Sequence, residues 1–260
     1  MDTATAIQPP SPILALTEPW RASLELAALP WSAPALATVP RGDGHAVLVL
    51  PGFGASDQST VILRSYLAQI GYDPHPWDLG TNLGPGAIGH DGAKLVARIG
   101  EIRASSGGKV SLVGWSLGGV MARLVSRQVP AAVRQVISLG APFTGSPRAT
   151  TVWQAYEELT GERVDDAHTA DRLRYAATPP PVPSTAIWSR EDGVVAWQNC
   201  VEPRHATSDN IEVHGSHSGL GVNATVLFAI ADRLALPEDE WAPFDRGGLR
   251  GFFYPSAGHA

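Results

Sequence analysis

The stretch GWSLGG at residues 114–119 places a serine where a strand pattern changes to a helix pattern. Residues 109–113 alternate β-branched and apolar side chains and predict a strand of a buried sheet. Beyond the serine, apolar residues recur at helical spacing as far as Pro130. A sharp turn between the two elements forces Ser116 into a strained backbone conformation, and the flanking glycines let neighbouring chain pass without a Cβ clash. This arrangement is typical of a nucleophile elbow.

The composition predicts one enzyme-sized domain. The chain has 260 residues, of which 44% are hydrophobic and 17% charged, and this is enough for a full core. The net charge of −6, without any Lys/Arg run, argues against a nucleic-acid partner. No apolar run is long enough for a transmembrane segment. Cys200 is the only cysteine, so no intrachain disulfide or thiolate metal cluster can form, and we expect it to be buried.

From residue 45 onward, strand-like and helix-like segments alternate, as in a mostly parallel sheet with helices on both faces. We expect strands at 45–50, 109–113, 133–139, 185–188 and 210–214, and helices at about 59–70, 91–104 and 223–236. Two further helical patterns, at 149–159 and 165–177, interrupt the alternation. Residues from about 146 to 183 are therefore expected to form a cap or lid inserted in a single α/β domain. The aromatic tail at 237–260 is expected to pack back on that domain.

Residues 1–40 form an N-terminal arm with seven prolines and no evident chemistry. One helix is expected in it, at 18–29, with Thr17 as N-cap and Pro19 in the first turn. Residues 1–12 lack the basic start and apolar core of a secretory signal. The cytoplasm is therefore the expected compartment, with secretion after removal of a signal as the alternative. The oligomeric state is left open, a homo-oligomer included.

A serine hydroxyl is a poor nucleophile at neutral pH, so the elbow calls for a histidine base and a carboxylate to orient it. In this class of sheet the order is serine, acid, histidine, each on a loop after a strand. Asp192, beside Gly193 and just beyond the strand at 185–188, is the candidate acid, with Glu191 as its rival. We expect the glycine to permit the tight turn that aims the carboxylate inward.

Two histidines lie near the last strand. The alternation of Ile211 and Val213 places His214 on the opposite face of that strand. His217 lies beyond it, on the loop before the final helix, where a base can reach a serine from another strand. We predict that His217 is the base and that His214 is a solvated strand-end residue.

Attack on a carbonyl also requires two N–H donors for the oxyanion. We predict the N–H of Leu117, directly after the serine, and that of Phe53, because the glycines around it in PGFG (51–54) let its N–H turn toward the site. An ordinary Pro-Gly turn is the alternative for PGFG. The side chains expected to line the substrate pocket are Trp115, Phe143, Trp153 and Tyr156. Val152 and Leu159 extend the apolar face of the helix that carries the last two.

These blocks resemble the α/β-hydrolase superfamily, and within it the bacterial serine esterases and lipases with a small helical cap. The resemblance spans about residues 45–236 and is carried by PGFG (51–54), GWSLGG (114–119), LGAPFTG (139–145), REDG (190–193) and GSHSGL (215–220). It implies Ser116 as nucleophile, Asp192 as orienting acid and His217 as base. The segment WDLGTNLG (77–84) also looks like a family loop near the site, with no role that we can assign.

The expected activity is hydrolysis of a small-molecule carboxylic ester, of short to medium acyl length, through an acyl-enzyme. No metal or organic cofactor is required, because the triad supplies both nucleophile and acid-base function. The same triad allows acyl transfer and thioester or amide cleavage, and a catalytically silent binding protein is an alternative from another class. Many lipases have His-Gly where this sequence has Pro51-Gly52, and they have His where this sequence has Trp115, directly before the nucleophile. Because of these two departures, we rank a lipase with a mobile lid, acting on long-chain triglycerides, second to an esterase acting on short to medium acyl esters.

Overall fold

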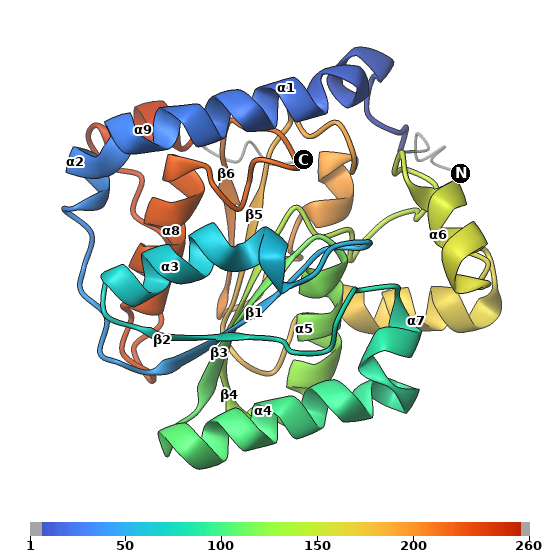
Figure 1. The fold of residues 1–260 in the computed structure, drawn as a ribbon, viewed down its shortest axis with the longest axis horizontal. Helices are drawn as coiled ribbons and strands as arrows, with labels where there is room; N and C mark the ends of the chain where they lie inside the picture. The colour runs from blue at the N-terminus through green and yellow to red at the C-terminus, as the bar shows by residue number, and fades with distance from the viewer. Residues whose placement is uncertain (1–6, 256–260) are drawn as a thin grey trace.

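The structure, a computed structural model, describes residues 7–255. Its centre is a six-stranded sheet of order β2-β1-β3-β4-β5-β6 in which every neighbouring pair is parallel. The strands are β1 (Ala46–Leu50), β2 (Asp73–Pro76), β3 (Val110–Trp115), β4 (Val133–Leu139), β5 (Ser184–Trp188) and β6 (Ser208–Glu212). Helices lie on both sides of the sheet (Figure 1). The expected fold class is confirmed, with a sheet that is parallel throughout.

The sheet is buried on both faces. Helices α3 (Val61–Gln69) and α8 (Ala224–Leu234) cover one face, and α4 (Ala93–Ser106) and α5 (Leu117–Gln128) cover the other. In β1, Val47 packs toward α3 and α8, whereas the next residue, Leu48, packs toward α4 and α5. All five residues of β1 are buried. This burial explains why its sequence is a continuous apolar run rather than an alternating one.

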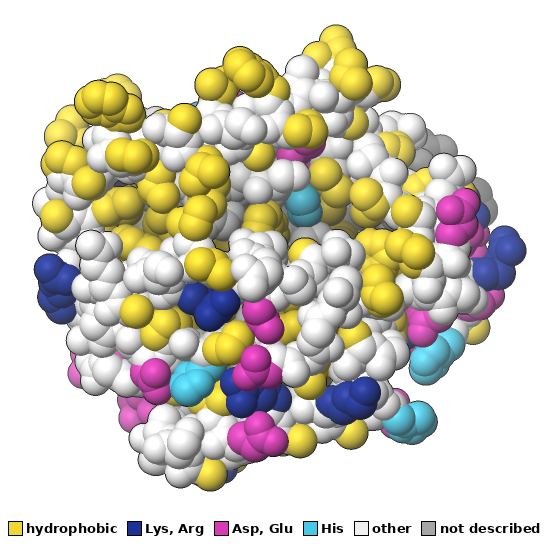
Figure 2. Space-filling view, viewed as in Figure 1, with side chains coloured by type: hydrophobic (Ala, Val, Ile, Leu, Met, Phe, Trp, Pro, Cys, Tyr) yellow, Lys and Arg dark blue, Asp and Glu magenta, His cyan; other side chains and the backbone are white. Residues whose placement is uncertain are grey.

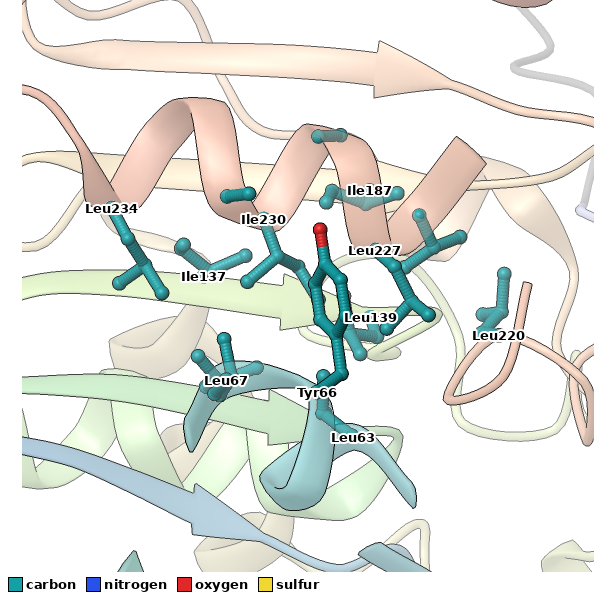
Figure 3. Packing of buried hydrophobic residues seen from close by; sticks show 14 of the residues in the cluster. Leu63, Tyr66, Leu67, Ile137, Leu139, Ile187, Leu220, Leu227, Ile230 and Leu234 are labelled. Carbon is teal, nitrogen blue, oxygen red and sulfur yellow. The ribbon is translucent and has the colours of Figure 1, made fainter. Parts of the chain in front are cut away.

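The core between α3, α8 and the sheet extends to the loop that precedes α8. Figure 3 shows the Tyr66 ring extending from α3 toward Leu227 and Ile230 of α8. Leu220, on the loop that precedes α8, is fully buried in the same cluster. Core packing therefore fixes the end of this loop. The Tyr66 hydroxyl is also buried and has no hydrogen-bond partner among the described residues, and burial raises its pKa to about 12.

Strand β2 was not predicted from the sequence. Its four residues, DPHP, contain two prolines, which cannot donate to a ladder and contradict the usual strand composition. They are tolerated because β2 is at the edge of the sheet and pairs only with β1. Edge strands are where proline is allowed in a sheet.

The N-terminal helix α1 (Pro12–Ala28) begins earlier than predicted. Ser11 is its N-cap, accepting a hydrogen bond from the Leu14 N–H at 3.3 Å, and Pro12 occupies the first turn. The prediction of Thr17 as cap was wrong, because the same Ser/Thr-then-Pro signal occurs upstream. Thr17 instead donates to the Ile13 carbonyl at 2.8 Å, and Pro19 lies inside the helix. Helix α1 runs along one edge of the molecule (Figure 1).

The remaining elements connect this framework. Between β4 and β5 lie the two predicted helices, α6 (Trp153–Thr160) and α7 (Ala167–Ala177). The short elements are η1 (Leu29–Ser32), α2 (Ala33–Leu36), η2 (Asp57–Thr60), η3 (Pro85–Ile88), η4 (His90–Gly92), η5 (Pro130–Ala132), η6 (Trp197–Cys200) and α9 (Arg250–Phe253). In the tail, Phe244 and Tyr254 are buried edge to face, whereas Phe252 is exposed. Cys200 is buried, as expected.

Two kinds of site are absent from residues 7–255. No helix there is long and apolar enough to cross a membrane. No group of three His, Cys, Asp or Glu side chains in the same range is arranged to hold a metal ion.

The unpartnered hydroxyl of Tyr66 gives a stability prediction. Tyr66→Phe removes a buried hydroxyl that makes no hydrogen bond to any residue in 7–255, and it should raise the free energy of unfolding by up to about 1 kcal/mol. Tyr254→Phe is the matched control, because its hydroxyl donates to the Thr225 carbonyl at 2.8 Å. It should lower the free energy of unfolding by about 1 kcal/mol. Urea unfolding measures both, and a loss of stability in Tyr66→Phe would contradict the assignment.

Candidate active site

Ser116 is the single residue between β3 and α5. Its φ of 53° and ψ of −122° lie in a region that L side chains rarely adopt, at a cost of about 1–3 kcal/mol. The Ser116 N–H donates to the Leu139 carbonyl at 2.7 Å, which anchors the turn to the end of β4. Strain of this kind persists only where the surrounding structure over-determines it, and it is concentrated at functional sites.

The glycines around the serine are required by close backbone contacts. A Cβ at Gly114 would lie 2.5 Å from backbone atoms of Gly118. A Cβ at Gly118 would lie 2.6 Å from the carbonyl oxygens of Leu50 and Pro51, at the end of β1. The start of α5 therefore packs against two strands with no room for side chains. This is the physical reason for the GWSLGG pattern.

Asp192 lies on the turn after β5 and is held from two sides. Its Oδ1 accepts hydrogen bonds from the N–H groups of Val194, at 2.8 Å, and Val195, at 2.7 Å. Its Oδ2 lies 2.6 Å from Nδ1 of His217, which comes from the loop after β6. Only 1% of the Asp192 side chain and 8% of the His217 side chain are exposed. The structure thus brings the candidate acid and base together in a buried pair.

The two rival residues form a separate pair at the surface. His214 Nδ1 lies 2.9 Å from Oε1 of Glu191, and their side chains are 64% and 48% exposed. Neither side chain contacts the buried pair through any hydrogen bond seen in the described chain.

The electrostatics of His217 reflect its partner. Burial alone would lower its pKa, but the charge of Asp192, the hydrogen bond to it and the charge of Glu18 raise the pKa above the ordinary histidine value. With Nδ1 bonded to a carboxylate, the proton of the neutral ring is on Nδ1, and Nε2 is left as an acceptor. This is the tautomer that a general base requires.

Contacts from several strands bring Ser116 and His217 to the same edge of the sheet. Trp115 Nε1 donates to the His217 carbonyl at 3.1 Å. A Cβ at Gly140, directly after β4, would lie 3.0 Å from His217 Nδ1 and 3.2 Å from Asp192 Oδ2. The neighbouring Leu139 carbonyl accepts the Ser116 N–H. Ser116, Asp192 and His217 therefore lie at the same, carboxyl edge of the sheet, directly after β3 and on the loops after β5 and β6.

The loop after β1 passes beside the serine. A Cβ at Gly52 would lie 3.3 Å from Cβ of Ser116 and 4.0 Å from its Oγ. Phe53 and Leu117 border the same cavity as Ser116. This is where a second N–H donor would have to lie, opposite the first residue of α5.

Asn82, in the WDLGTNLG segment, holds the loop after β1. It is completely buried, and its Nδ2 donates to the Pro51 carbonyl at 2.8 Å. Its backbone N–H donates to the Ala55 carbonyl, and its carbonyl accepts from the Gly54 N–H, both at 2.8 Å. We assigned this segment no role from sequence, and the only available signal was an asparagine within it. The structure gives it the task of fixing the backbone beside the serine.

A cavity of about 100 Å³ opens at Ser116. Its walls come from the loop after β1, from α5 and from α6 and α7, and they include Val152, Trp153, Tyr156 and Leu173. The Phe53 and Tyr156 side chains both line the cavity and contact each other, with ring centroids 5.3 Å apart. The Tyr156 hydroxyl donates to Glu162 at 2.9 Å, so the polar end of this side chain is satisfied by another side chain.

Two of the four expected pocket residues are elsewhere. Trp115 turns toward Gly221, where a Cβ would lie 3.0 Å from its ring, and packs with the α8 cluster. Phe143 is fully buried beneath the guanidinium of Arg123, 3.8 Å from its ring centroid. Leu159, expected on the apolar face of α6, is 61% exposed. Trp153 and Tyr156 do line the cavity.

Comparison with solved structures gives the same architecture. Aspergillus fumigatus lipase B superposes with a TM-score of 0.54 at 19% identity, over 76% of this chain and 54% of that chain. The Paleococcus ferrophilus monoacylglycerol lipase gives 0.53 at 14% identity, over 74% and 96%. The pyrethroid hydrolase PytH gives 0.52 at 19%, over 75% and 99%. This chain spans about half the length of the Aspergillus enzyme.

No protein-family model matches the sequence, and no curated protein matches it either. The structural likeness, at these identities, establishes the fold. The chain has the α/β-hydrolase fold.

The buried pair gives a prediction that needs no substrate. In the wild type, the NMR titration of His217 should give a pKa above the ordinary value of about 6.5. Asp192→Asn removes the charge and the carboxylate acceptor but leaves the burial, so the pKa of His217 should fall. Glu191→Gln is the matched control, because Glu191 pairs with His214 and not with His217, and it should leave the pKa of His217 unchanged. The pairing is refuted if Glu191→Gln, rather than Asp192→Asn, moves the titration of His217.

Proposed function

We propose that the protein is a carboxylic ester hydrolase that works through an acyl-enzyme. Ser116 is the nucleophile, His217 the general base and Asp192 the residue that orients the base. The observation that carries the proposal is a serine in a strained elbow at the same sheet edge as a buried histidine whose Nδ1 is 2.6 Å from a carboxylate. Two structures of the same fold are named as lipases, which supports an ester as the substrate.

In the first half of the reaction, Ser116 Oγ attacks the ester carbonyl and His217 Nε2 takes its proton. The same proton then goes to the leaving alcohol, and an acyl group remains on Ser116. In the second half, His217 takes a proton from the water that attacks the acyl-enzyme, and it returns this proton to Ser116 Oγ as the bond from Oγ to the acyl carbon breaks and the acid leaves. Asp192 stays ionised and stabilises the imidazolium formed in each half.

The oxyanion of each tetrahedral intermediate is stabilised by N–H groups of Leu117 and Phe53. Leu117 is the first residue of α5, and the first N–H groups of a helix have no partner within the helix. They also lie at the positive end of the helix dipole. Asn82 holds the 51–55 loop in place, so the second donor is set before substrate binds. Such donors need no reorganisation during the reaction.

The size and lining of the cavity favour short to medium acyl chains. A volume of about 100 Å³ is well below the roughly 300–1,000 Å³ of sites for drug-sized ligands. Its walls are mainly apolar and include side chains of α6 and α7, as a cap over an acyl site would supply. We infer that residues 146–183 act as that cap and that the acyl chain lies against Val152, Trp153 and Tyr156.

The proposed roles predict the kinetics of three alanine variants on p-nitrophenyl butyrate. Ser116→Ala and His217→Ala should each lower kcat by about 10⁴-fold or more, and the double variant should be little worse than either. His214→Ala should stay within about twofold, because its side chain is largely exposed and paired with Glu191. Retained turnover in His217→Ala, or its loss in His214→Ala, would reassign the base.

The cavity predicts the preferred chain length. Tributyrin should be hydrolysed faster than triolein, and the rate on tributyrin should rise smoothly through its solubility limit, because the acyl site is already walled by α6 and α7. Rates measured below and above that limit check this expectation. A sharp rise at the interface with a preference for triolein would point to a mobile lid and leave the triad roles untouched.

A further inference from the structure

Helix α1 turns a charged side chain inward and apolar side chains outward, the reverse of an ordinary surface helix. Glu18 is its one fully buried residue, whereas Ile13, Leu16 and Trp20 are 75%, 84% and 68% exposed. Figure 2 shows hydrophobic side chains gathered along the edge of the molecule where α1 runs. A surface helix normally turns its apolar stripe inward and its charges outward. The inverted arrangement calls for a reason specific to the inward carboxylate.

The Glu18 carboxylate bridges the two loops that carry the acid and the base. Its Oε1 accepts hydrogen bonds from the N–H groups of Gly193, at 2.7 Å, and His217, at 3.0 Å. Its Oε2 accepts from the Ser218 N–H at 3.0 Å. Gly193 directly follows Asp192. One side chain from the N-terminal arm therefore fixes the backbone on both sides of the Asp192–His217 hydrogen bond.

Glu25, two helical turns further along α1, also binds the loop between β6 and α8, which carries His217. Its Oε1 accepts from both the N–H and the hydroxyl of Ser216 at 2.7 Å. Its Oε2 accepts from Nδ2 of Asn223 at 2.9 Å, and Asn223 is the N-cap of α8. Glu25 thus joins the loop to the start of α8 and makes no hydrogen bond to His217 or to the acid loop. This difference makes Glu25 a natural control for Glu18.

The loops have glycine where α1 approaches them. A Cβ at Gly193 would lie 2.4 Å from the Leu14 carbonyl oxygen, and a Cβ at Gly219 would lie 2.4 Å from Glu25 Oε2. Arg21 also links the helix to the acid loop, since it donates to Glu18 at 2.9 Å and to the Glu191 carbonyl at 2.7 Å. The contact between α1 and the loops is therefore complementary from both sides.

We propose that Glu18 is a positioning residue for the reaction, which sets the relative placement of Asp192 and His217 by bridging their loops. This inference rests on the proposed acyl-enzyme function and adds one residue of the N-terminal helix, Glu18, to the groups that position the acid and the base. A carboxylate suits the task because it is an acceptor for several N–H groups at once, and each such charge-assisted bond is stronger than a neutral one. The helix that we first interpreted as an arm without chemistry thereby acts as a clamp on the site.

The ionisation of Glu18 agrees with this role. Burial raises the pKa of its carboxyl, but the N–H groups of Ser218, Gly193 and His217 and the charge of His217 lower it, and the net pKa lies below the ordinary value. Glu18 is therefore negative at neutral pH, and its charge helps to raise the pKa of His217.

The titratable and charged groups near His217 and its loop come from two parts of the chain, the segment that follows β5 and helix α1. Asp192 and the buried Cys200 thiol lie on the β5 side, and the Cys200 pKa is raised by burial and by the charge of Asp192. Glu18, Arg21 and Glu25 come from α1.

The test compares Glu18→Gln with Glu25→Gln in the full-length protein. Glu18→Gln keeps the side-chain size but removes the charge and turns one acceptor into a donor facing an N–H group. We expect kcat to fall about 10- to 100-fold with KM within about twofold, because the acid and base are displaced while the cavity is not touched. The acidic limb of the kcat/KM profile should move to lower pH, since loss of the Glu18 charge lowers the pKa of His217.

Glu25→Gln should lower the free energy of unfolding by about as much as Glu18→Gln does. It should nevertheless leave kcat within about threefold of the wild type and leave the acidic limb in place. Glu18→Asp retains the charge and serves if the glutamine variant does not fold. It should lower kcat with a smaller shift of the acidic limb. The proposal is overturned if Glu18→Gln loses stability as Glu25→Gln does but keeps the wild-type kcat and acidic limb, since Glu18 would then be structural only.

NMR titration of His217 separates this inference from the proposed function. If the wild type hydrolyses no ester, the proposed function fails, and the pKa of His217 in Glu18→Gln still decides the positioning role. A lowered pKa together with loss of the downfield Nδ1–H resonance supports the bridge. An unchanged pKa and resonance overturns it.

Discussion

The hydrogen bond between Asp192 and His217 is the interaction on which the rest of the site depends. It joins loops from two neighbouring strands and is almost fully buried, so both partners lose solvent and must be satisfied by the protein. The Val194 and Val195 N–H groups satisfy the other oxygen of Asp192. On the far side, Glu18 takes up the N–H groups of Gly193 and His217. The pair is thus held by groups that come from three separated parts of the chain.

The parallel sheet explains why these groups can meet. All six strands end at the same edge, so the loops after β1, β3, β5 and β6 converge there without long connections. The strained conformation of Ser116 is maintained by contacts that leave no room for side chains at Gly114 and Gly118. Both the dense packing around the elbow and the glycines within it follow from one constraint, because the backbone segments on either side of Ser116 approach each other too closely for side chains.

Sequence reasoning succeeded where the signal was local. The strand periodicity at 133–139 and the glycine spacing around Ser116 are short-range patterns, and the structure has β4 at Val133–Leu139 and a serine between β3 and α5. It failed where tertiary contacts decide. Strand β2 contains two prolines and exists because it lies at a sheet edge. The direction of Phe143 depends on Arg123, which stacks on it from another element. Glu18 meets Gly193 and His217 across at least 175 residues of chain, and no sequence periodicity encodes such a contact.

The central claim is that Ser116 is a nucleophile facing two backbone N–H donors, with His217 behind it. The most direct test is a crystal structure of the protein after reaction with a short-chain alkyl fluorophosphonate. The account predicts a covalent bond from phosphorus to Ser116 Oγ, with the phosphoryl oxygen about 2.7–3.1 Å from the N–H groups of Phe53 and Leu117. The alkyl chain should lie in the cavity bordered by Trp153 and Tyr156. An unmodified Ser116, or an adduct whose phosphoryl oxygen points away from both N–H groups, would contradict it.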